Sequence, residues 1–251
     1  MKLLASDFDN TLLFHNQMKD DDVNRIKQFQ KDGNLFGVCT GRSFKGIDKA
    51  SQPYQLNYDF YILLSGAYIL NKQKEIIFEK QIPMNLVIEI FDYSNHQEAS
   101  VVYQNEMYIV TSKKEHDYFG IYLESFKQLQ TDSVSAFSFH FKKDEIKKAT
   151  KLTQMINKKY GHMIEAFQNN EHIDLAPKGC SKGNGIKIIK DYFQIDDQDI
   201  YAIGDSTNDL PMLDVVKNSY TFTYAKQNVQ KHANHIVESL ADCIQDIEKY
   251  K

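Results

Sequence analysis

Short apolar runs that end abruptly in polar residues are the feature that most constrains the fold of this chain. Four such runs stand in the sequence, at residues 2–5, 35–39, 60–64 and 200–203. Continuous apolar runs of this length are typical of strands that are buried on both faces, as in a parallel sheet. The sequence therefore predicts a sheet whose strands lie in the centre of a layered domain.

Helical patterns separate these runs. Residues 20–22 are all aspartate, which favours a helix start because acidic groups stabilise the positive end of the helix dipole, and Gly33 favours the helix end. Residues 43–51 and 183–193 also predict helices. Because strands and helices alternate, we expect right-handed crossovers and an α/β fold with a doubly wound, mainly parallel, Rossmann-like sheet.

The middle of the chain has a different pattern, which predicts an α+β module inserted into the α/β core. Helices are expected at 84–96, 116–129 and 144–160, and strands at 99–103, 107–111, 134–141, 163–167 and 172–175. Phenylalanines alternate with polar residues in 134–141, and we expect His140 to lie on a solvated strand face. The predicted domains are a core of residues 1–82 and 179–251 and an inserted domain of residues 83–178.

Composition excludes several classes of protein. Of 251 residues, 42% are hydrophobic and 25% charged, which excludes collagenous, low-complexity and disordered chains. The net charge of −4 argues against a nucleic-acid partner. The apolar runs are far shorter than the about 20 residues of a membrane helix. The apolar run at the start of the sequence is also too short for the core of a signal peptide. Cys39, Cys180 and Cys243 are too widely spaced for a disulfide framework or zinc site, so we expect a reduced, cytoplasmic setting.

The polar residues that follow the predicted strands are expected to meet. Ligands of an open α/β sheet bind beyond the carboxyl ends of its strands. The polar side chains expected there are Asp7, Asp9, Thr40, Arg42, Ser65, Asp205 and Asp209. Carboxylates gathered at one place repel one another unless a cation lies among them. Because the expected ligands are oxygens only, without histidine or cysteine, a hard ion such as Mg²⁺ is favoured.

The spacing of Asp7 and Asp9 would allow covalent catalysis by a carboxylate. Two residues apart on an extended strand, they would face the same side. One carboxylate could attack as a nucleophile while the other exchanges a proton with the leaving group. Lys182, at the start of a predicted helix, could offset the repulsion between a carboxylate and an approaching phosphate.

Each of these pieces has an ordinary interpretation when it stands alone. Asp7 and Asp9 could lie in a surface turn, Thr40 could be a helix N-cap, and Lys182 could be a solvated lysine. Residues 204–209 alone are similar to a calcium loop or a turn. Their common placement at predicted strand ends and a helix start favours a shared site.

Four motifs in order resemble the haloacid dehalogenase (HAD) superfamily of phosphatases. They are Asp7-Phe8-Asp9-Asn10-Thr11-Leu12-Leu13, Thr40-Gly41-Arg42, Lys182-Gly183-Asn184-Gly185, and Gly204-Asp205-Ser206-Thr207-Asn208-Asp209 followed by Met212-Leu213. The insertion between the second and third motifs resembles the cap of the Cof-type subfamily. The resemblance covers nearly the whole chain.

The resemblance implies a role for each matching residue. Asp7 would be the nucleophile, Asp9 the general acid and base whose backbone carbonyl reaches Mg²⁺, and Lys182 the balancing charge. Thr40 would bind the transferring phosphoryl group, while Asp205 and Asp209 would hold Mg²⁺ or orient its waters. The residues implied on the substrate side are Gly41, Arg42, Ser65, Gly66 and Asn208, of which Asn208 would contact the phosphate or orient Lys182.

The sequence departs from the family pattern at a few positions. Asn10 stands where glycine is frequent, and Ser65 replaces a common asparagine. The usual glycine-containing turn after the fourth motif is absent from Tyr220–Ala225. We expect these changes to bear on the substrate more than on the chemistry.

The predicted function is an Mg²⁺-dependent phosphatase that hydrolyses small phosphorylated metabolites through an aspartyl-phosphate on Asp7. A sugar phosphate, a nucleotide or a phosphorylated cofactor is the expected partner, and the chain is expected to be a monomer or a weak homo-oligomer. Two alternatives stay open. One is phosphomutase-type transfer within a sugar. The other is a non-catalytic signalling module that accepts a phosphoryl group, although such modules are much shorter and lack an inserted cap.

Overall fold

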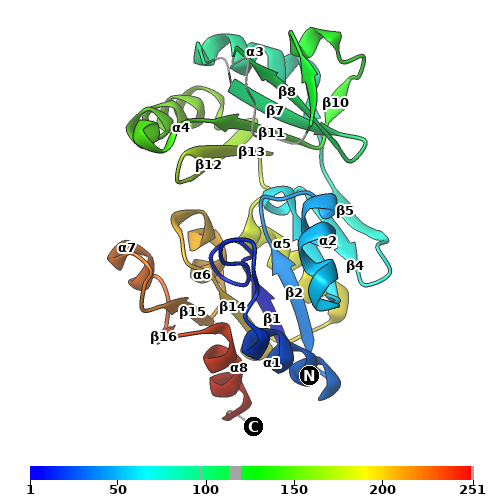
Figure 1. Cartoon of the computed structure of the whole chain (residues 1–251), viewed down its shortest axis with the longest axis vertical. Helices are drawn as coiled ribbons and strands as arrows, with labels where there is room; N and C mark the ends of the chain where they lie inside the picture. The colour runs from blue at the N-terminus through cyan, green and yellow to red at the C-terminus, as the bar shows by residue number, and fades with distance from the viewer. Residues whose placement is uncertain (97, 113–119, 250–251) are drawn as a thin grey trace. The chain divides into compact units, whose positions relative to one another are not determined.

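The chain forms two compact units, and the second is inserted into the sequence of the first (Figure 1). The computed structural model describes residues 1–96, 98–112 and 120–249. The first unit joins Met1–Phe78 with Ser181–Lys251, and the second unit is Glu79–Cys180.

The first unit is built on an eight-stranded sheet with the order β16-β15-β14-β1-β2-β3-β4-β5. Its strands are β1 (Leu3–Ser6), β2 (Leu35–Cys39), β3 (Phe60–Leu63), β4 (Tyr68–Asn71), β5 (Ile76–Glu79), β14 (Ile200–Ile203), β15 (Asn218–Phe222) and β16 (His235–Val237). The pairs from β16 across to β3 are parallel, and β3 pairs with β4 antiparallel. The expected α/β fold with a mainly parallel sheet is confirmed.

Helices cover both faces of this sheet. They are α1 (Asp20–Lys31), α2 (Phe44–Ser51), α5 (Lys182–Phe193), α6 (Leu210–Val215), α7 (Gln227–Gln230) and α8 (Leu240–Lys249). Leu3 and Ala5 of β1 share a buried cluster with Ile186 of α5 and Met212 of α6. Leu4 lies between them in sequence and is fully buried on the opposite face, because side chains alternate along a strand.

Helix α1 packs against α8 as well as against β2 (Figure 1). Val23, Ile26 and Phe29 are its buried apolar residues, as their helical spacing predicts. Asp22 is also buried, and its Oδ1 accepts a hydrogen bond of 2.8 Å from the backbone N–H of Ala241 in the first turn of α8. This contact fixes the two helices to each other at one end.

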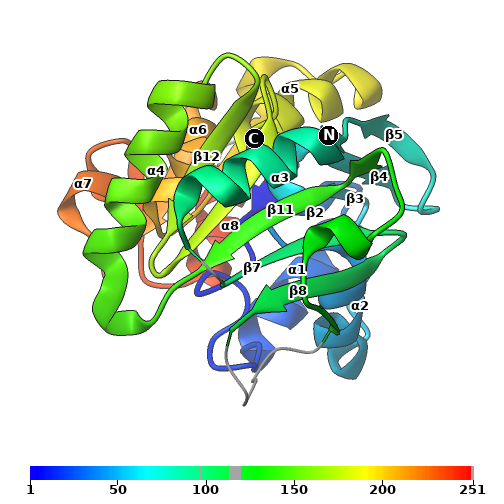
Figure 2. The ribbon, with the colours of Figure 1, turned by 90° about the horizontal axis from the view of Figure 1, so that it is seen from above.

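The second unit is an α+β module with the strand order β12-β13-β11-β7-β8-β9. Its elements are β6 (Ile82–Pro83), α3 (Met84–Ser94), β7 (Glu98–Tyr103), β8 (Glu106–Thr111), β9 (Ile121–Leu123), β10 (Ser133–Val134), β11 (Ala136–His140), α4 (Ile146–Tyr160), β12 (Ile164–Asn169) and β13 (His172–Pro177). Figure 2 shows α3 and α4 on the same side of the sheet. Their apolar residues bury Phe137 and Phe139 of β11, as the alternation predicts.

The prediction of a helix at residues 116–129 is wrong for the part of this range that the structure describes. Residues 121–123 form β9, which pairs in parallel with β8, and residues 126–128 form a short 3₁₀ turn that Ser125 caps. Edge pairing of β-favouring residues such as Ile121 and Tyr122 outweighs the weak helical spacing. Residues 116–119 of the expected helix lie outside the described residues.

The prediction that His140 lies on a solvated strand face is also wrong. Its side chain is only 8% exposed, because β11 lies between β7 and β13. His140 Nε2 lies 2.8 Å from Ser100 Oγ, and its Nδ1 lies 3.1 Å from Nδ1 of His172. Polar side chains of neighbouring strands therefore take the place of water around the ring.

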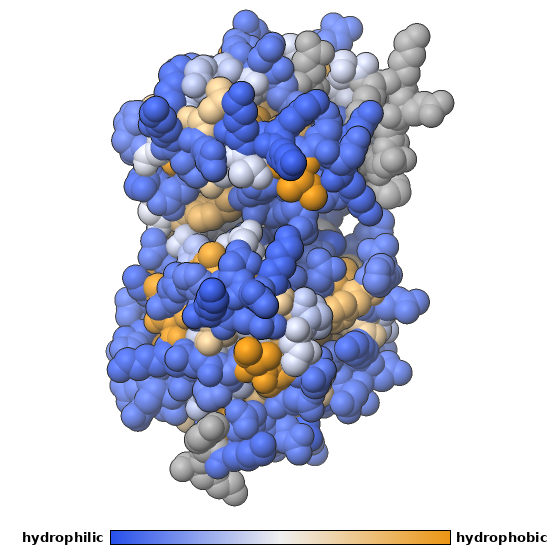
Figure 3. Space-filling model, turned by 90° about the vertical axis from the view of Figure 1, so that its left-hand side faces the viewer, coloured by the Kyte–Doolittle hydropathy of each residue, from blue (hydrophilic) through white to orange (hydrophobic). Residues whose placement is uncertain are grey.

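Hydrophilic side chains dominate the molecular face drawn in Figure 3, and apolar residues occupy small separate spots. Within the described ranges, every helix is too short or too polar to cross a bilayer.

Candidate active site

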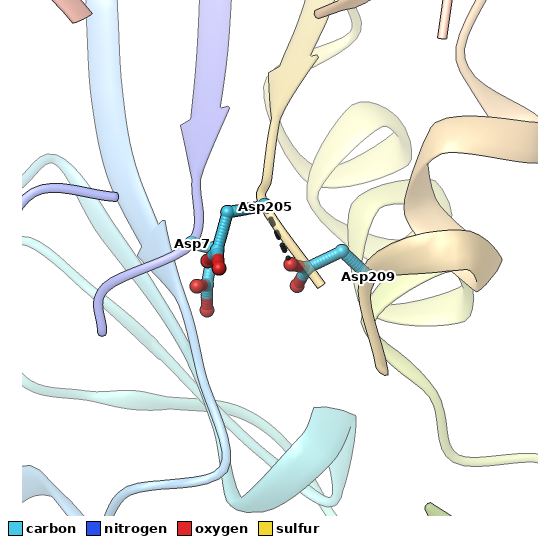
Figure 4. A group of neighbouring side chains, drawn as sticks. All are labelled: Asp7, Asp205 and Asp209. Carbon is cyan, nitrogen blue, oxygen red and sulfur yellow. Dashed lines mark hydrogen bonds between the residues drawn. The ribbon is translucent and has the colours of Figure 1, made fainter. Parts of the chain in front are cut away.

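The candidate site begins where β1 and β14 end side by side. The two strands pair in parallel, with Ser6 opposite Ile203, so the residues that follow them leave the sheet at the same edge. The backbone N–H of Asp7 donates a 2.9 Å hydrogen bond to the carbonyl of Ile203 and extends this pairing by one residue. Asp7 and Asp205 are thus brought together by strand register (Figure 4).

Three carboxylates form a cluster at this edge (Figure 4). One oxygen from each of Asp7, Asp205 and Asp209 lies within 4.8 Å of the others. Asp209 Oδ2 accepts hydrogen bonds from the backbone N–H groups of Asp205 at 3.0 Å and Ser206 at 2.9 Å. Gly204 is required here, because a Cβ on it would lie 2.6 Å from Cγ of Asp209.

Lys182 brings one positive charge into the cluster. It is the first residue of α5 and is 2% exposed, and the hydroxyl of the N-cap Ser181 accepts from the backbone N–H of Asn184. Lys182 Nζ lies 2.5 Å from Oδ1 of Asp7 and 2.5 Å from Oδ1 of Asp209. Burial alone would lower the pKa of Lys182, but the charges of Asp209 and Asp7 outweigh burial and raise it.

The cluster carries more negative charge than Lys182 can balance. Burial, followed by the charge of Asp209, raises the pKa of Asp7 well above its usual range despite the neighbouring ammonium. The same two causes raise the pKa of Asp205 to about 6. A divalent cation would supply the missing positive charge, and an all-oxygen donor set suits a hard ion such as Mg²⁺.

The three carboxylates differ in how free their oxygens are. Both oxygens of Asp209 already accept hydrogen bonds, from Lys182 and from the backbone of the 204–206 turn. The carboxylate of Asp205 is bound less fully: its Oδ1 accepts from Thr11 Oγ1 at 3.1 Å, and neither of its oxygens contacts Lys182 in the bonds found for the described chain. Asp7 and Asp205, which have fewer bonded oxygens than Asp209, could therefore hold a metal ion, while Asp209 could orient Lys182.

The side chain of Asp9 lies outside the carboxylate cluster and pairs with Arg42. Arg42 Nε lies 2.8 Å from Oδ2 of Asp9, and Nη2 lies 2.6 Å from Oδ1. Both side chains are about a third exposed, at 34% and 35%. The guanidinium also lies over the ring of Phe8, with 5.3 Å between its Cζ and the ring centroid. Asp9 is therefore next to the cluster in sequence but directed to a different partner.

The ends of β2 and β3 supply the next group of expected residues. Thr40 is 2% exposed, and its Oγ1 accepts a 3.1 Å bond from the backbone N–H of Arg42, so Gly41 lies within a tight turn. The backbone N–H of Ser65 donates to the carbonyl of Thr40 at 3.0 Å. Gly66 has φ +89°, and a Cβ on it would lie 2.3 Å from the carbonyl oxygen of Ser181. These contacts join the turn after β3 to the start of α5.

Asn208 is half-buried in the turn that carries Asp205 and Asp209, and its Oδ1 accepts a hydrogen bond from Ser206 Oγ. In the described chain, the bond found for its side chain lies within this turn rather than with Lys182. The structure thus places Asn208 near the cluster without a direct contact to the lysine.

Two residues near the site were not singled out from the sequence. Thr11 is fully buried and donates to Asp205, and its position inside the first motif was a usable signal. Tyr224 donates a 2.6 Å hydrogen bond from its hydroxyl to the carbonyl of Asn10, and no pattern in the sequence indicated that contact. Cys39 is buried beside Lys182, and burial raises the pKa of its thiol, which favours a packing role over a nucleophilic one.

Comparisons with known proteins agree on one family. A family model described as haloacid dehalogenase-like hydrolase matches residues 4–243. A Haemophilus influenzae protein provisionally named a phosphatase is 25% identical, over 93% of this chain and 91% of the relative. The fold is similar to that of a provisionally named HAD/COF-like hydrolase from Plasmodium vivax, with a TM-score of 0.87, 19% identity and coverage of 100% and 96%. It is also similar to the subclass IIB sugar phosphatase BT4131, with a TM-score of 0.79, 18% identity and coverage of 100% and 99%.

Proposed function

The chain belongs to the haloacid dehalogenase-like hydrolases, and from that premise we propose that it is an Mg²⁺-dependent phosphatase of small phosphate monoesters. The resemblance to the HAD superfamily and its Cof-type branch, seen in the four motifs, is confirmed. Beyond membership of the family, the proposal specifies the metal, the class of substrate, and an aspartyl-phosphate intermediate on Asp7.

The observation that carries the proposal is the buried ion pair between Lys182 and Asp7 beside Asp205. A carboxylate can attack a phosphate only if nearby positive charge offsets the repulsion between two anions. Lys182 provides one such charge at 2.5 Å from Oδ1 of Asp7. Asp7 and Asp205 would hold Mg²⁺, which when bound would partly neutralise the phosphoryl oxygens.

The proposed reaction proceeds in two displacements. A carboxylate oxygen of Asp7 bonds to phosphorus while the bond from phosphorus to the ester oxygen breaks, and Asp9 gives its proton to the departing alcohol. Water then bonds to the phosphorus of the aspartyl-phosphate and gives a proton to Asp9. The acyl-phosphate bond breaks, inorganic phosphate leaves, and the carboxylate of Asp7 is restored.

Asp9 must leave Arg42 to act in this way. Both of its carboxylate oxygens accept from the guanidinium, so in this arrangement the carboxyl group is directed at Arg42 and not at a leaving group. An arriving phosphate offers Arg42 another anionic partner, because guanidinium groups bind phosphate as readily as carboxylate. We propose that Arg42 exchanges Asp9 for the substrate, and that Thr40, Gly41, Ser65, Gly66 and Asn208 complete the phosphate side of the site.

The inserted residues 83–178 are proposed to act as the cap that selects the leaving group. The module has a core of its own, so its exposed residues can vary without disturbing the catalytic unit. We also propose that the protein acts in the cytoplasm, as a monomer or weak homo-oligomer without a nucleic-acid partner. The three unbridged, buried cysteines suit a reducing setting.

A phosphate-release assay over several dozen phosphorylated metabolites tests the proposal, with Mg²⁺ or EDTA and with Asp7→Asn as the matched control. We expect inorganic phosphate from at least one ester, only with Mg²⁺ and only with Asp7 present. Comparison by kcat/KM then ranks the substrates. If the wild-type protein releases no phosphate from any ester while a commercial phosphatase does, the proposal is wrong. Isomerised sugar phosphate without free phosphate would instead indicate a mutase.

A further inference from the structure

The loop that follows β1 holds an unusual backbone conformation directly beside Asp9. Asn10 has φ +58°, in the left-handed region where residues other than glycine are uncommon. Asparagine tolerates this region better than most residues, but it still favours negative φ. Some contact must therefore hold the loop in the conformation that sets the position of Asp9.

Backbone hydrogen bonds explain only part of this conformation. The N–H of Asn10 donates to the carbonyl of Leu13 at 2.9 Å, and the N–H groups of Leu12 and Leu13 both donate to the carbonyl of Phe8. These bonds close the turn on itself. The side chain of Thr11 ties the turn to Asp205. The carbonyl of Asn10 points to a different partner, which comes from another element.

That partner is Tyr224, whose hydroxyl donates a 2.6 Å hydrogen bond to the carbonyl of Asn10. Its ring stacks on Phe222 with centroids 4.8 Å apart and meets Phe14 edge-on at 6.0 Å. The backbone around it is also anchored, because Gln230 Nε2 donates to the carbonyls of Phe222 and Thr223. Tyr224 is half-exposed, yet these contacts hold its ring and the backbone next to it in place.

We propose that Tyr224 is a positioning residue for the proposed reaction: it fixes the left-handed Asn10, and so holds the backbone from which the Asp9 side chain, once released from Arg42, can give a proton to the leaving group. Both contact residues lie at places where the sequence departs from the family pattern. Asn10 stands where glycine is frequent, and Tyr224 lies in the stretch without the usual glycine-containing turn. The hydroxyl of Tyr224 thus supports the backbone of Asn10.

Burial, together with the negative charges of Asp205 and Asp7, raises the pKa of Tyr224. The hydroxyl therefore keeps its proton and stays a hydrogen-bond donor at neutral pH.

The inference rests on the proposed phosphatase activity, and the test separates the two. Tyr224→Phe keeps both ring contacts and removes only the hydroxyl. Phenyl phosphate has a leaving group that needs a proton, whereas p-nitrophenyl phosphate has one that leaves without it. We expect kcat/KM of Tyr224→Phe to fall about fivefold for phenyl phosphate, the loss of one ordinary hydrogen bond, and less than about twofold for p-nitrophenyl phosphate.

Two further variants show whether Tyr224 acts through Asp9. In an Asp9→Asn background, the Tyr224→Phe change should cost nothing more with phenyl phosphate, because the proton donor is already absent. Tyr192→Phe is the matched control, since Tyr192 is similarly exposed and its hydroxyl accepts from Asn71 rather than contacting this loop. It should leave both rates unchanged.

Equal slowing of the two esters by Tyr224→Phe, or full additivity with Asp9→Asn, would overturn the positioning role. A fall in melting temperature without a change in the ratio of the two rates would assign Tyr224 a structural role only. If the wild-type protein hydrolyses neither ester nor any member of the metabolite panel, the proposed function fails instead.

Discussion

The ammonium of Lys182 lies 2.5 Å from a carboxylate oxygen of Asp7, and both side chains are almost fully buried, with 2% and 6% exposed. An ion pair withdrawn from water in this way depends on both partners, since either charge alone would be strongly disfavoured. Here the lysine also serves Asp209, so its removal would leave two buried carboxylates facing each other.

Lys182→Met should therefore destabilise the metal-free protein. Loss of one partner of a buried pair costs about 3–5 kcal/mol in unfolding free energy. Urea unfolding at pH 7 with EDTA measures this directly. Lys190→Met is the matched control on the same helix, because Lys190 forms an exposed pair of the same 2.5 Å length with Asp197. The control should barely move the urea midpoint. Similar midpoints for the two variants would show that the buried pair contributes no more to the free energy of unfolding than the exposed pair.

Mg²⁺ should stabilise the folded protein through Asp7 and Asp205. At a concentration of 100 times Kd, a ligand that binds only the folded state adds about 2.7 kcal/mol to its stability. Thermal melts with and without Mg²⁺ should show an increase for the wild type and little increase for Asp205→Asn. Asp9→Asn is the control, because the Asp9 side chain is turned to Arg42. An undiminished Mg²⁺ shift in Asp205→Asn would exclude Asp205 as a ligand.

Gly66 and Gly33 allow the cost of a close approach to be separated from the cost of a left-handed backbone. Their φ angles are +89° and +85°, but an added Cβ would lie 2.3 Å from Ser181 O at Gly66 and meets nothing within 4 Å at Gly33. Gly33→Ala should cost about 1–2 kcal/mol from conformation alone. Gly66→Ala should cost more and should also slow turnover, because it displaces the residue before Lys182. Equal losses in urea unfolding would contradict the steric argument.

Much of the fold follows from the order of apolar runs and helix signals. The strands β1, β2, β3 and β14 lie where continuous apolar residues predicted them, because both faces of a central strand are buried. Edge strands were harder, since β5 and β16 are partly exposed and lack that signal. Residues 121–123 form another edge strand, β9, and its residues are likewise exposed or only half-buried.

The candidate site was predictable to the level of which residues gather, but not of which side chains touch. Strand register brings Asp7 beside Asp205, and that follows from two adjacent strand ends. The pairing of Asp9 with Arg42, and of Tyr224 with Asn10, depends on loop conformations that no short-range pattern encodes. His140 was misplaced because alternation identifies a polar face but not the neighbouring strands that cover it.

Asp22 makes the free energy of unfolding depend on pH, and this contribution is independent of the active site. Burial raises its pKa above the ordinary value of 3.8, and within the described chain its Oδ2 has no hydrogen-bond partner. The folded state therefore holds a proton that the unfolded state has released. This contribution is present below pH 3.8 and is lost as the pH rises through the raised pKa.

Asp22→Asn removes that titration while it keeps an oxygen for the N–H of Ala241. Its unfolding free energy relative to the wild type should therefore rise as the pH increases from about 4 toward 7. Urea unfolding over that range measures the difference. The exposed Asp20, in the same helical turn, provides the control substitution Asp20→Asn. A difference between Asp22→Asn and the wild type that stays constant with pH would show that Asp22 keeps the same charge in both states.

Trapping the covalent intermediate tests the central claim, that Asp7 takes the phosphoryl group, most directly. The wild-type protein with Mg²⁺ is mixed with the best ester of the panel, quenched in acid during turnover, and reduced with borohydride, which converts an acyl-phosphate to an alcohol. Mass spectrometry of the peptide that contains Asp7 and Asp9 should locate homoserine at position 7 alone, and Asp7→Asn should yield none. Turnover by the wild type with reduction at Asp9 or Asp205, or with no reduced residue under conditions that trap a control acyl-phosphate enzyme, would contradict the account.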